Sequence, residues 1–438
     1  MDFPFARMLA LAIVLAGMLP APARAQEQEA ERLRIHGSHT VGERLVPALV
    51  EDWLRAMEYT GIRRVPRAPG LLEIHALREG VPLVVEIGGE GGGEGFRRLV
   101  EGQAELAMLA RRPDAREREA GWQLGDLSSP DQEYLLALNA ARVVVHRDSA
   151  LKRIDLAQLR ALLAGSAPGA ANRLLLGPAG GGLEGFLRAR LNGGRPLRPA
   201  GVLRHRDLRS AAAAAAFDPS ALAVVELGTP LPPGVRVLPV SDGGLAVAPD
   251  PTGIRSQDYP LAWRYQVYGG QMMSALGRSF ALHTLTPRAQ ALVQRLGLVS
   301  MDLPLPATGE VAALPPDYRD AIAGGTRLPL ALRFNLKSLT TIFDGSSAHD
   351  LERVVELLQR PEYRGRSVSV VGFSQAERQS KLFAMTASSN RADIVAAWLI
   401  ERGIAVRRIR GLGALQPLAG GEGEEARFRN ERVELWLL

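Results

Sequence analysis

The chain has 438 residues, no cysteine and a formal net charge of +6. Its length predicts two or three domains, and 46% hydrophobic with 23% charged residues is ordinary for a globular protein. The lack of cysteine excludes disulfide bonds and thiolate metal ligands. The arginines are scattered rather than gathered in basic runs, so we expect no nucleic-acid partner, whereas an anionic ligand is compatible with the charge.

The N-terminal segment is predicted to be a secretory signal peptide over residues 1–25. An apolar run covers Met8–Leu19, and an A-x-A cleavage pattern follows at Ala23–Ala25. The run is too short to span a bilayer stably, so a membrane anchor is the less favoured alternative. We therefore expect a periplasmic protein that could attach to the cell wall or to the outer-membrane face.

Residues 33–301 alternate strand-like and helix-like segments. The first strand is predicted at 33–36, and the helix predicted at 41–57 carries Leu45, Leu49 and Trp53 on one face, the spacing of an amphipathic helix. Such alternation predicts an α/β domain whose sheets are covered on both faces. Further strands are predicted at 141–146, 173–176 and 221–226, and further helices at 156–163 and 183–191.

Three segments share one design, in which a strand leads through small or hydroxyl residues into a helix. The first contains Ser38, His39 and Thr40, the second runs over 88–95, and the third runs over 177–182. Helix N-termini carry unpaired N–H groups and partial positive charge, so they bind anions. Three of them aimed at one point would hold a small oxyanion.

These loops have alternative interpretations. Thr40 and Glu43 match a capping box, so Thr40 could simply cap its own helix, and this alternative stays open. The chain has no Gly-Lys pair and hence no NTP-binding P-loop. The G-x-G-x-x-G pattern at 180–185 lacks the acidic residue that dinucleotide binding needs. We found no catalytic motif and no metal set, so we expect no enzyme activity, no cofactor and no metal.

Several motifs in this region resemble one known family. They are SHT at 38–40, GGG at 91–93, GQAELAM at 102–108 with Arg111, and YPL at 259–261. Together they are similar to PstS-like, phosphate-binding periplasmic solute-binding proteins. The resemblance implies a solute-binding domain over 33–301, with two hinged α/β lobes that close on a ligand. The ligand-binding residues it implies are Ser38, His39, Thr40, Gly91, Gly92, Gly93, Arg111, Gly180, Gly181 and Gly182.

The chain departs from this family in two loops. Glycines replace the hydroxyl residues of the third loop, and Leu183 replaces an arginine. Glu90 and Glu94 bring negative charge to the second loop, so either they point away and cap the helix from Gly95 or the ligand has changed. Two hypotheses follow. One is a binding protein for phosphate or another small anion that could serve an ABC importer. The other is an envelope interaction or sensory protein that has lost phosphate binding.

Residues 302–329 are rich in proline and glycine and are predicted to be a linker. Residues 330–438 are predicted to form a second unit, a small α+β sandwich. Strands are predicted at 332–335, 367–371, 406–410 and 432–437, and helices at 348–358 and 392–402.

The second unit also resembles a known family. It contains VGFS at 371–374, S-x-x-R-A at 388–392 and NERVE at 430–434, which together are similar to the OmpA-like peptidoglycan-binding domain. The resemblance implies that Arg391 holds a carboxylate of the peptidoglycan stem peptide, a role that suits a guanidinium. Gln375 stands where the family has an aspartate that binds the ammonium group. A fold-stabilising ion pair is the alternative role of Arg391.

Overall fold

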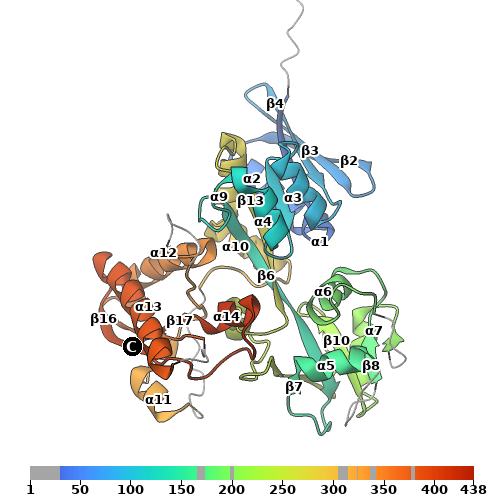
Figure 1. Cartoon of the computed structure of the whole chain (residues 1–438). Coiled ribbons are helices and arrows are strands. Elements are labelled where there is room, and N and C mark those ends of the chain that lie inside the picture. Colours follow the sequence, from blue (N-terminus) through green and yellow to red (C-terminus); the bar gives the residue numbers. More distant parts are fainter. Residues whose placement is uncertain are drawn as a thin grey trace, which may run out of the picture.

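The computed structural model describes residues 30–164, 173–197, 202–303, 314–322, 324–335, 342–375 and 380–438. The predicted signal peptide lies outside these residues. A two-lobed N-terminal unit packs against a smaller C-terminal unit (Figure 1). Within the described ranges, no helix combines the length and the apolar character needed to cross a membrane.

The first lobe is built on a mixed sheet in the order β2-β3-β4-β1-β5-β13-β6. β1 pairs in parallel with β4 and β5, and Leu33 and Ile35 of β1 are fully buried, as expected for a strand covered on both faces. The strands are β1 (Glu31–Gly37), β2 (Thr60–Ala68), β3 (Leu71–Arg78), β4 (Val81–Gly88), β5 (Leu106–Leu109), β6 (Glu133–His146) and β13 (Ala262–Gly269). The helices are α1 (His39–Glu43), α2 (Leu45–Ala56), α3 (Gly92–Val100), α4 (Ala115–Ala120), α8 (Pro251–Arg255), α9 (Ala275–Thr284) and α10 (Pro287–Arg295).

The long strand β6 connects the two lobes. Its first half pairs with β13 in the first lobe, and its second half pairs with β10 and β11 in the second lobe. The predicted two-lobed α/β fold is thereby confirmed. The second lobe holds β7 (Ile154–Asp155), β8 (Arg173–Leu176), β9 (Val202–Arg204), β10 (Ala221–Glu226), β11 (Val235–Leu238), β12 (Val240–Ser241), α5 (Leu156–Leu163), α6 (Gly182–Leu191) and α7 (Leu208–Ala215).

The C-terminal unit has a four-stranded sheet in the order β14-β17-β15-β16 with helices packed on it. It has its own hydrophobic core, to which Leu351, Val370, Leu399 and Leu435 contribute. The predicted α+β class is confirmed. Its elements are α11 (Pro316–Ile322), β14 (Thr326–Arg327), α12 (Gly345–Gln359), β15 (Val368–Gly372), α13 (Lys381–Glu401), β16 (Val406–Gly411), α14 (Glu424–Asn430) and β17 (Val433–Leu437).

The structure differs from the predicted linker in the second half of 302–329. There α11 and β14 belong to the C-terminal unit, and β14 pairs with β17. Tyr318 packs edge-on against Phe373 and Trp436, with ring centroids 5.4 and 5.9 Å apart. Local sequence does not predict this contact, because the segment is rich in proline and glycine and shows no apolar periodicity. Its aromatic partners also lie far away in the chain.

Other element boundaries also shift. The helix predicted at 41–57 is interrupted at Arg44, between α1 and α2. α13 begins at Lys381 rather than at Ala392. The strand predicted at 332–335 forms only two isolated bridges. Element ends depend on tertiary contacts, so they are the least predictable part of a sequence reading.

The C-terminal unit contacts both lobes. On the first lobe, Arg255 donates to both carboxylate oxygens of Asp350 at 2.9 and 2.6 Å, and this pair is buried. On the second lobe, Asp242 lies 3.0 Å from Arg429, and the N–H of Leu245 donates to the carbonyl of Pro417 in the C-terminal unit at 2.8 Å. α14 lies between the second lobe and the body of the C-terminal unit (Figure 1).

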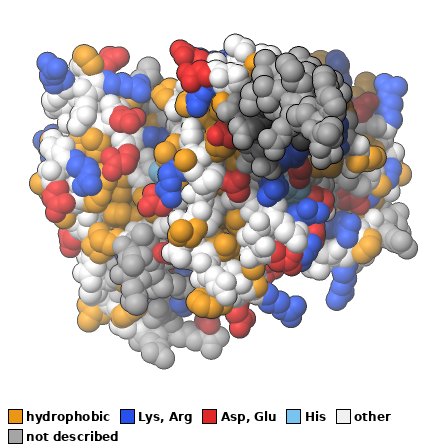
Figure 2. All heavy atoms as spheres, turned by 90° about the horizontal axis from the view of Figure 1, so that it is seen from above, with side chains coloured by type: hydrophobic (Ala, Val, Ile, Leu, Met, Phe, Trp, Pro, Cys, Tyr) orange, Lys and Arg blue, Asp and Glu red, His pale blue; other side chains and the backbone are white. Residues whose placement is uncertain are grey.

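Figure 2 shows side chains of both charges interspersed over one face, in agreement with the scattered arginines of the sequence.

Candidate functional site

A cleft of about 930 Å³ lies between the two lobes. The structure brings nine of the ten predicted ligand-binding residues to this cleft: Ser38, His39, Thr40, Gly92, Gly93, Arg111, Gly180, Gly181 and Gly182. Gly91 is not among the lining residues. It precedes α3 with φ 115°, and its N–H donates to the carbonyl of Gly37 at 2.8 Å. The three loops therefore converge, although they are far apart in the sequence.

The first loop places Thr40 against the third loop. α1 begins at His39, so Thr40 lies inside the helix, and the N-cap Ser38 makes no side-chain cap bond. The predicted capping box at Thr40 is therefore absent. A Cβ atom added to Gly182 would lie 2.9 Å from Thr40 Oγ1, so the backbone of the second lobe approaches this hydroxyl closely. The glycine permits this close approach, because a Cβ atom would force Thr40 or the loop to shift.

The glutamates of the second loop do not line the cleft. Glu90 lies 2.6 Å from His36 Nδ1 and 3.4 Å from Arg98 Nε. Glu94 accepts a hydrogen bond from Arg97 at 2.6 Å, and this bond contributes most to lowering the pKa of Glu94 to about 2. Of the two alternatives left open for these residues, the structure supports the first in part, because both point away from the cleft. Neither caps a helix at Gly95, since α3 begins at Gly92 and its N-cap Gly91 has no side-chain cap bond.

Two groups predicted to bind the ligand already have internal partners. Arg111 donates to both carboxylate oxygens of Glu117 at 2.6 Å, and this contact contributes most to raising the pKa of Arg111. The N–H of Gly180 donates to Glu184 at 2.9 Å. An incoming anion would therefore share these groups with carboxylates of the protein.

The cleft wall is nevertheless rich in positive charge. Of the residues that the structure describes, six arginines and two glutamates line it, and Phe186 of α6 packs against Trp263 of β13 with ring centroids 4.4 Å apart. Sequence reasoning missed most of this wall, because β13 and α14 carry no loop motif that would mark them. The charged lining residues are Arg111, Arg112, Arg118, Arg190, Arg264, Arg429, Glu424 and Glu425.

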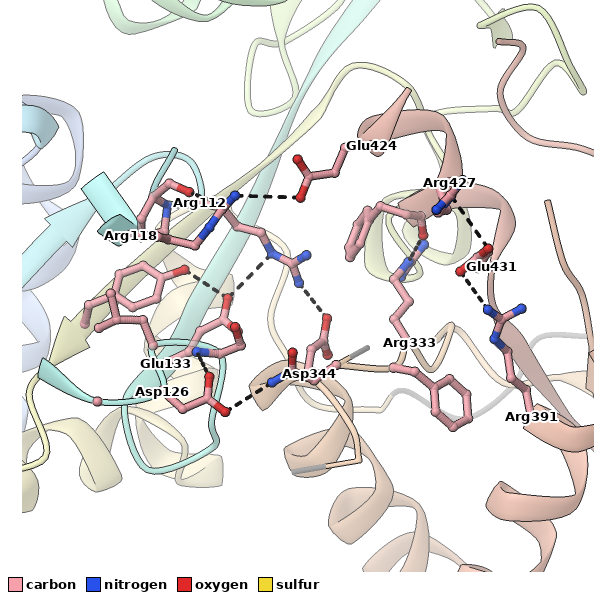
Figure 3. Close-up of a pocket in the computed structure, with 18 residues that line it drawn as sticks. Arg112, Arg118, Asp126, Glu133, Arg333, Asp344, Arg391, Glu424, Arg427 and Glu431 are labelled. Carbon is pink, nitrogen blue, oxygen red and sulfur yellow. Dashed lines mark hydrogen bonds and ion pairs between the residues drawn. The ribbon is translucent and has the colours of Figure 1, made fainter. Parts of the chain in front are cut away.

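A second cavity of about 580 Å³, the interface pocket, lies between the first lobe and the C-terminal unit (Figure 3). Arg391 lines this pocket, but Gln375 does not. The Gln375 amide donates to the carbonyl of Gly421 at 2.7 Å and accepts from Asn430 at 2.6 Å. The structure therefore separates the two predicted peptidoglycan-binding residues, because Gln375 is buried and holds a loop in place.

Arg391 has contacts that fit both of its predicted roles. Its Nη2 donates to Glu431 at 2.7 Å and its Nη1 donates to Ser374 at 3.2 Å, so the ion pair of the structural alternative exists. The same guanidinium faces the interface pocket, with Glu431 beside it (Figure 3). A carboxylate ligand would bind Arg391 in place of Glu431, which is an exchange of one charged hydrogen bond for another.

Buried charges position the two units around the interface pocket. Arg112 of the first lobe lies 2.5 Å from Asp344 and stacks over the ring of Phe428, 4.1 Å from its centroid. Burial alone would raise the pKa of Asp344, but Arg112 and Arg264 outweigh it and lower this pKa to about 2. The carboxylate thus stays ionised and keeps the units together near neutral pH.

Comparisons with known proteins find a family match in the C-terminal unit. Residues 337–431 match the OmpA family. The chain is 36% identical over 104 residues to the probable lipoprotein YiaD of Escherichia coli (strain K12), which is 22% of this chain and 46% of that protein. The match therefore spans about half the length of the curated relative.

The similar solved structures cover the N-terminal part. An ABC-type phosphate transport receptor from Vibrio cholerae is 15% identical, with a TM-score of 0.45 over 61% of this chain and 99% of that chain. A possible phosphate binding protein from Planctomyces limnophilus DSM 3776 is 15% identical, with a TM-score of 0.47 over 62% and 93%. PstS from Borrelia burgdorferi is 16% identical, with a TM-score of 0.46 over 62% and 98%. The chain thus carries an OmpA-family domain in its C-terminal unit, joined to a two-lobed α/β unit.

Proposed function

We propose that this protein is a binding protein of the cell envelope. It holds phosphate or another small anion between its lobes and attaches to peptidoglycan through its C-terminal unit. The OmpA-family match supports an envelope location, with the periplasm as the compartment. The observation that carries the anion is the convergence of three loops on one cleft lined by six arginines and two glutamates. An anion placed there gains from the positive wall and from the Thr40 hydroxyl.

The affinity is expected to be moderate. Arg111 is paired with Glu117 at 2.6 Å, and Arg190 with Asp242 at 2.9 Å. These carboxylates neutralise part of the charge that a ligand would otherwise meet. A buried anion binds well only when its charge is compensated by nearby groups.

Calorimetric titration of residues 26–438 with inorganic phosphate tests the cleft. We expect saturable heat, and we expect Thr40→Val to weaken binding by about tenfold, since one hydrogen bond to a charged group contributes about 1.5 kcal/mol. Thr60→Val, an exposed hydroxyl in β2, is the matched control and should bind as the unchanged protein does. No heat and no thermal shift at millimolar phosphate would rule the anion site out.

Specific observations also favour a second candidate, an envelope interaction or sensory protein whose cleft no longer binds phosphate. Glu117 holds both terminal nitrogens of Arg111, and Glu184 holds the N–H of Gly180. Phosphorus analysis of protein purified from the periplasm separates the candidates. Protein that is free of phosphorus and gives no heat with phosphate supports the second.

Attachment to the cell wall is tested with isolated peptidoglycan. Arg391→Ala should abolish sedimentation of the protein with peptidoglycan, because the guanidinium is the proposed partner of a stem-peptide carboxylate. Arg407→Ala, an exposed position on β16, is the control. Unchanged binding of Arg391→Ala would contradict the site.

Delivery of the anion to an ABC permease remains a further prediction, which co-purification of a permease with the intact protein would test.

A further inference from the structure

The pocket that Arg391 faces is built by both units, not by the C-terminal unit alone. We propose that the wall-binding site is composite, with Arg118 of the N-terminal unit holding a second carboxylate of the peptide whose first carboxylate binds Arg391. The ligand class is a short peptide that carries at least two carboxylates and an ammonium group. This inference rests on the proposed attachment to peptidoglycan, and it assigns to the N-terminal unit a part in wall binding.

The charge of the interface pocket points to a zwitterionic ligand. Among the described residues, five arginines and five carboxylate residues line it, so a ligand of a single sign would be repelled by half of this described wall. A volume of about 580 Å³ accommodates a short peptide. The N-terminal unit contributes Arg112, Arg118, Asp126 and Glu133 to this wall.

Two kinds of charged group can be distinguished in the wall. Arg112 and Asp344 form a close ion pair at 2.5 Å that joins the two units, and Glu133 lies 2.9 Å from Arg264 within the first lobe. Arg118 and Arg427 instead have side chains that are 36% and 53% exposed, and their nearest carboxylates lie at 3.7 and 4.0 Å. Such long, exposed pairs contribute about 0–1 kcal/mol, so these guanidinium groups turn to a ligand at little cost.

The positions of these groups agree with the proposal. Figure 3 shows Arg118 and Arg427 on opposite sides of the pocket, with Glu424 between them and Arg391 beyond Glu431. Arg118 belongs to α4 and also donates to the carbonyl of Pro113 at 2.6 Å, which anchors one end of its guanidinium and leaves the other end toward Glu424. A peptide that spans the pocket would therefore meet one arginine from each unit.

The test uses residues 26–438 with isolated peptidoglycan and with the soluble stem tripeptide L-Ala-γ-D-Glu-diaminopimelate. Arg118→Ala should weaken both by about fivefold or more, since it removes a charge-assisted contact. Arg118→Lys should restore part of the affinity, because the charge returns without the fork geometry. The control is Arg206→Ala, because the side chain of Arg206 is 87% exposed and lies on the second lobe. This variant should bind both probes as the unchanged protein does.

The outcomes separate this inference from the proposed function. A lower affinity of Arg118→Ala with an unchanged urea midpoint supports a ligand contact, whereas a lower affinity that merely follows a lower midpoint indicates a structural role and overturns the inference. If Arg391→Ala loses binding while Arg118→Ala binds normally, the composite site is wrong and wall attachment stands. If the unsubstituted protein binds neither probe, both fall.

Discussion

The interlobe cleft and the interface pocket are neighbours with different charge. Within the described ranges, six arginines and two glutamates line the cleft, while five arginines and five carboxylate residues line the pocket. A wall of one predominant sign favours an anion, whereas a balanced wall favours a ligand that carries both charges. The two cavities nevertheless share Arg112, Arg118, Glu424 and Phe428, so α14 serves as a wall for both. Neighbouring sites can thus differ in selectivity while the same side chains contribute to each.

The largest expected effect comes from breaking the buried Arg255–Asp350 ion pair, which joins the first lobe to the C-terminal unit. Asp350→Ala leaves Arg255 buried without its carboxylate, which should lower the free energy of unfolding by about 3–5 kcal/mol. Stem-peptide binding should be lost with it, because the pocket exists only while the units are docked. Urea unfolding and peptide titration measure both effects. Asp148→Ala, in an exposed carboxylate of the second lobe, should change neither, and a stable Asp350→Ala protein would contradict the importance of this pair.

A pH effect should weaken the same interface. His349 of α12 packs beside Tyr134 of β6, with ring centroids 6.1 Å apart. Burial, followed by the charge of Arg353, lowers the pKa of His349 to about 4 from a usual value of 6.5. The unfolded chain therefore binds a proton that the folded chain does not between these pH values, so the free energy of unfolding falls as pH drops from 6.5 to 4, by up to about 3 kcal/mol.

Urea unfolding at pH 7.5, 6 and 5 checks this dependence, and His349→Leu should flatten it. The low pKa of Asp344 affects the stability of the fold in a separate, more acidic pH range. That carboxylate stabilises the fold above its unfolded pKa of 3.8 and loses its contribution as pH falls toward 2. An equally steep loss between pH 6.5 and 5 in His349→Leu would show that another group is responsible.

The smallest expected effect concerns the cleft alone. In Gly182→Ala the new methyl group meets Thr40, so the loops must separate slightly, at a cost of about 1 kcal/mol. We expect phosphate affinity to fall several-fold and peptidoglycan binding to stay unchanged. Gly185→Ala, one turn further along α6 with open space for a methyl group, is the matched control. Equal phosphate affinity in both variants would show that the approach of Gly182 to Thr40 does not shape the site.

Much of the framework could be predicted from local sequence. Alternating segments indicated β1, β8, β10 and α5, and the loop design indicated which helix ends would meet. Local patterns did not indicate that Gln375 turns inward to Asn430, that α11 packs on Phe373, or that α14 reaches the interlobe cleft. These contacts join residues far apart in the chain, and no periodicity within one segment encodes them.

The sequence by itself determined the fold class, the two units and the residues of the three loops, because hydrophobic periodicity and glycine positions act over a few residues. Only the tertiary structure decided which charges face a ligand. It paired Arg111 with Glu117 and Arg391 with Glu431, directed Glu90 to His36, and formed the interface pocket from both units. The physical reason is that electrostatic interactions depend on distance and burial in space, and both are set only when distant segments pack together.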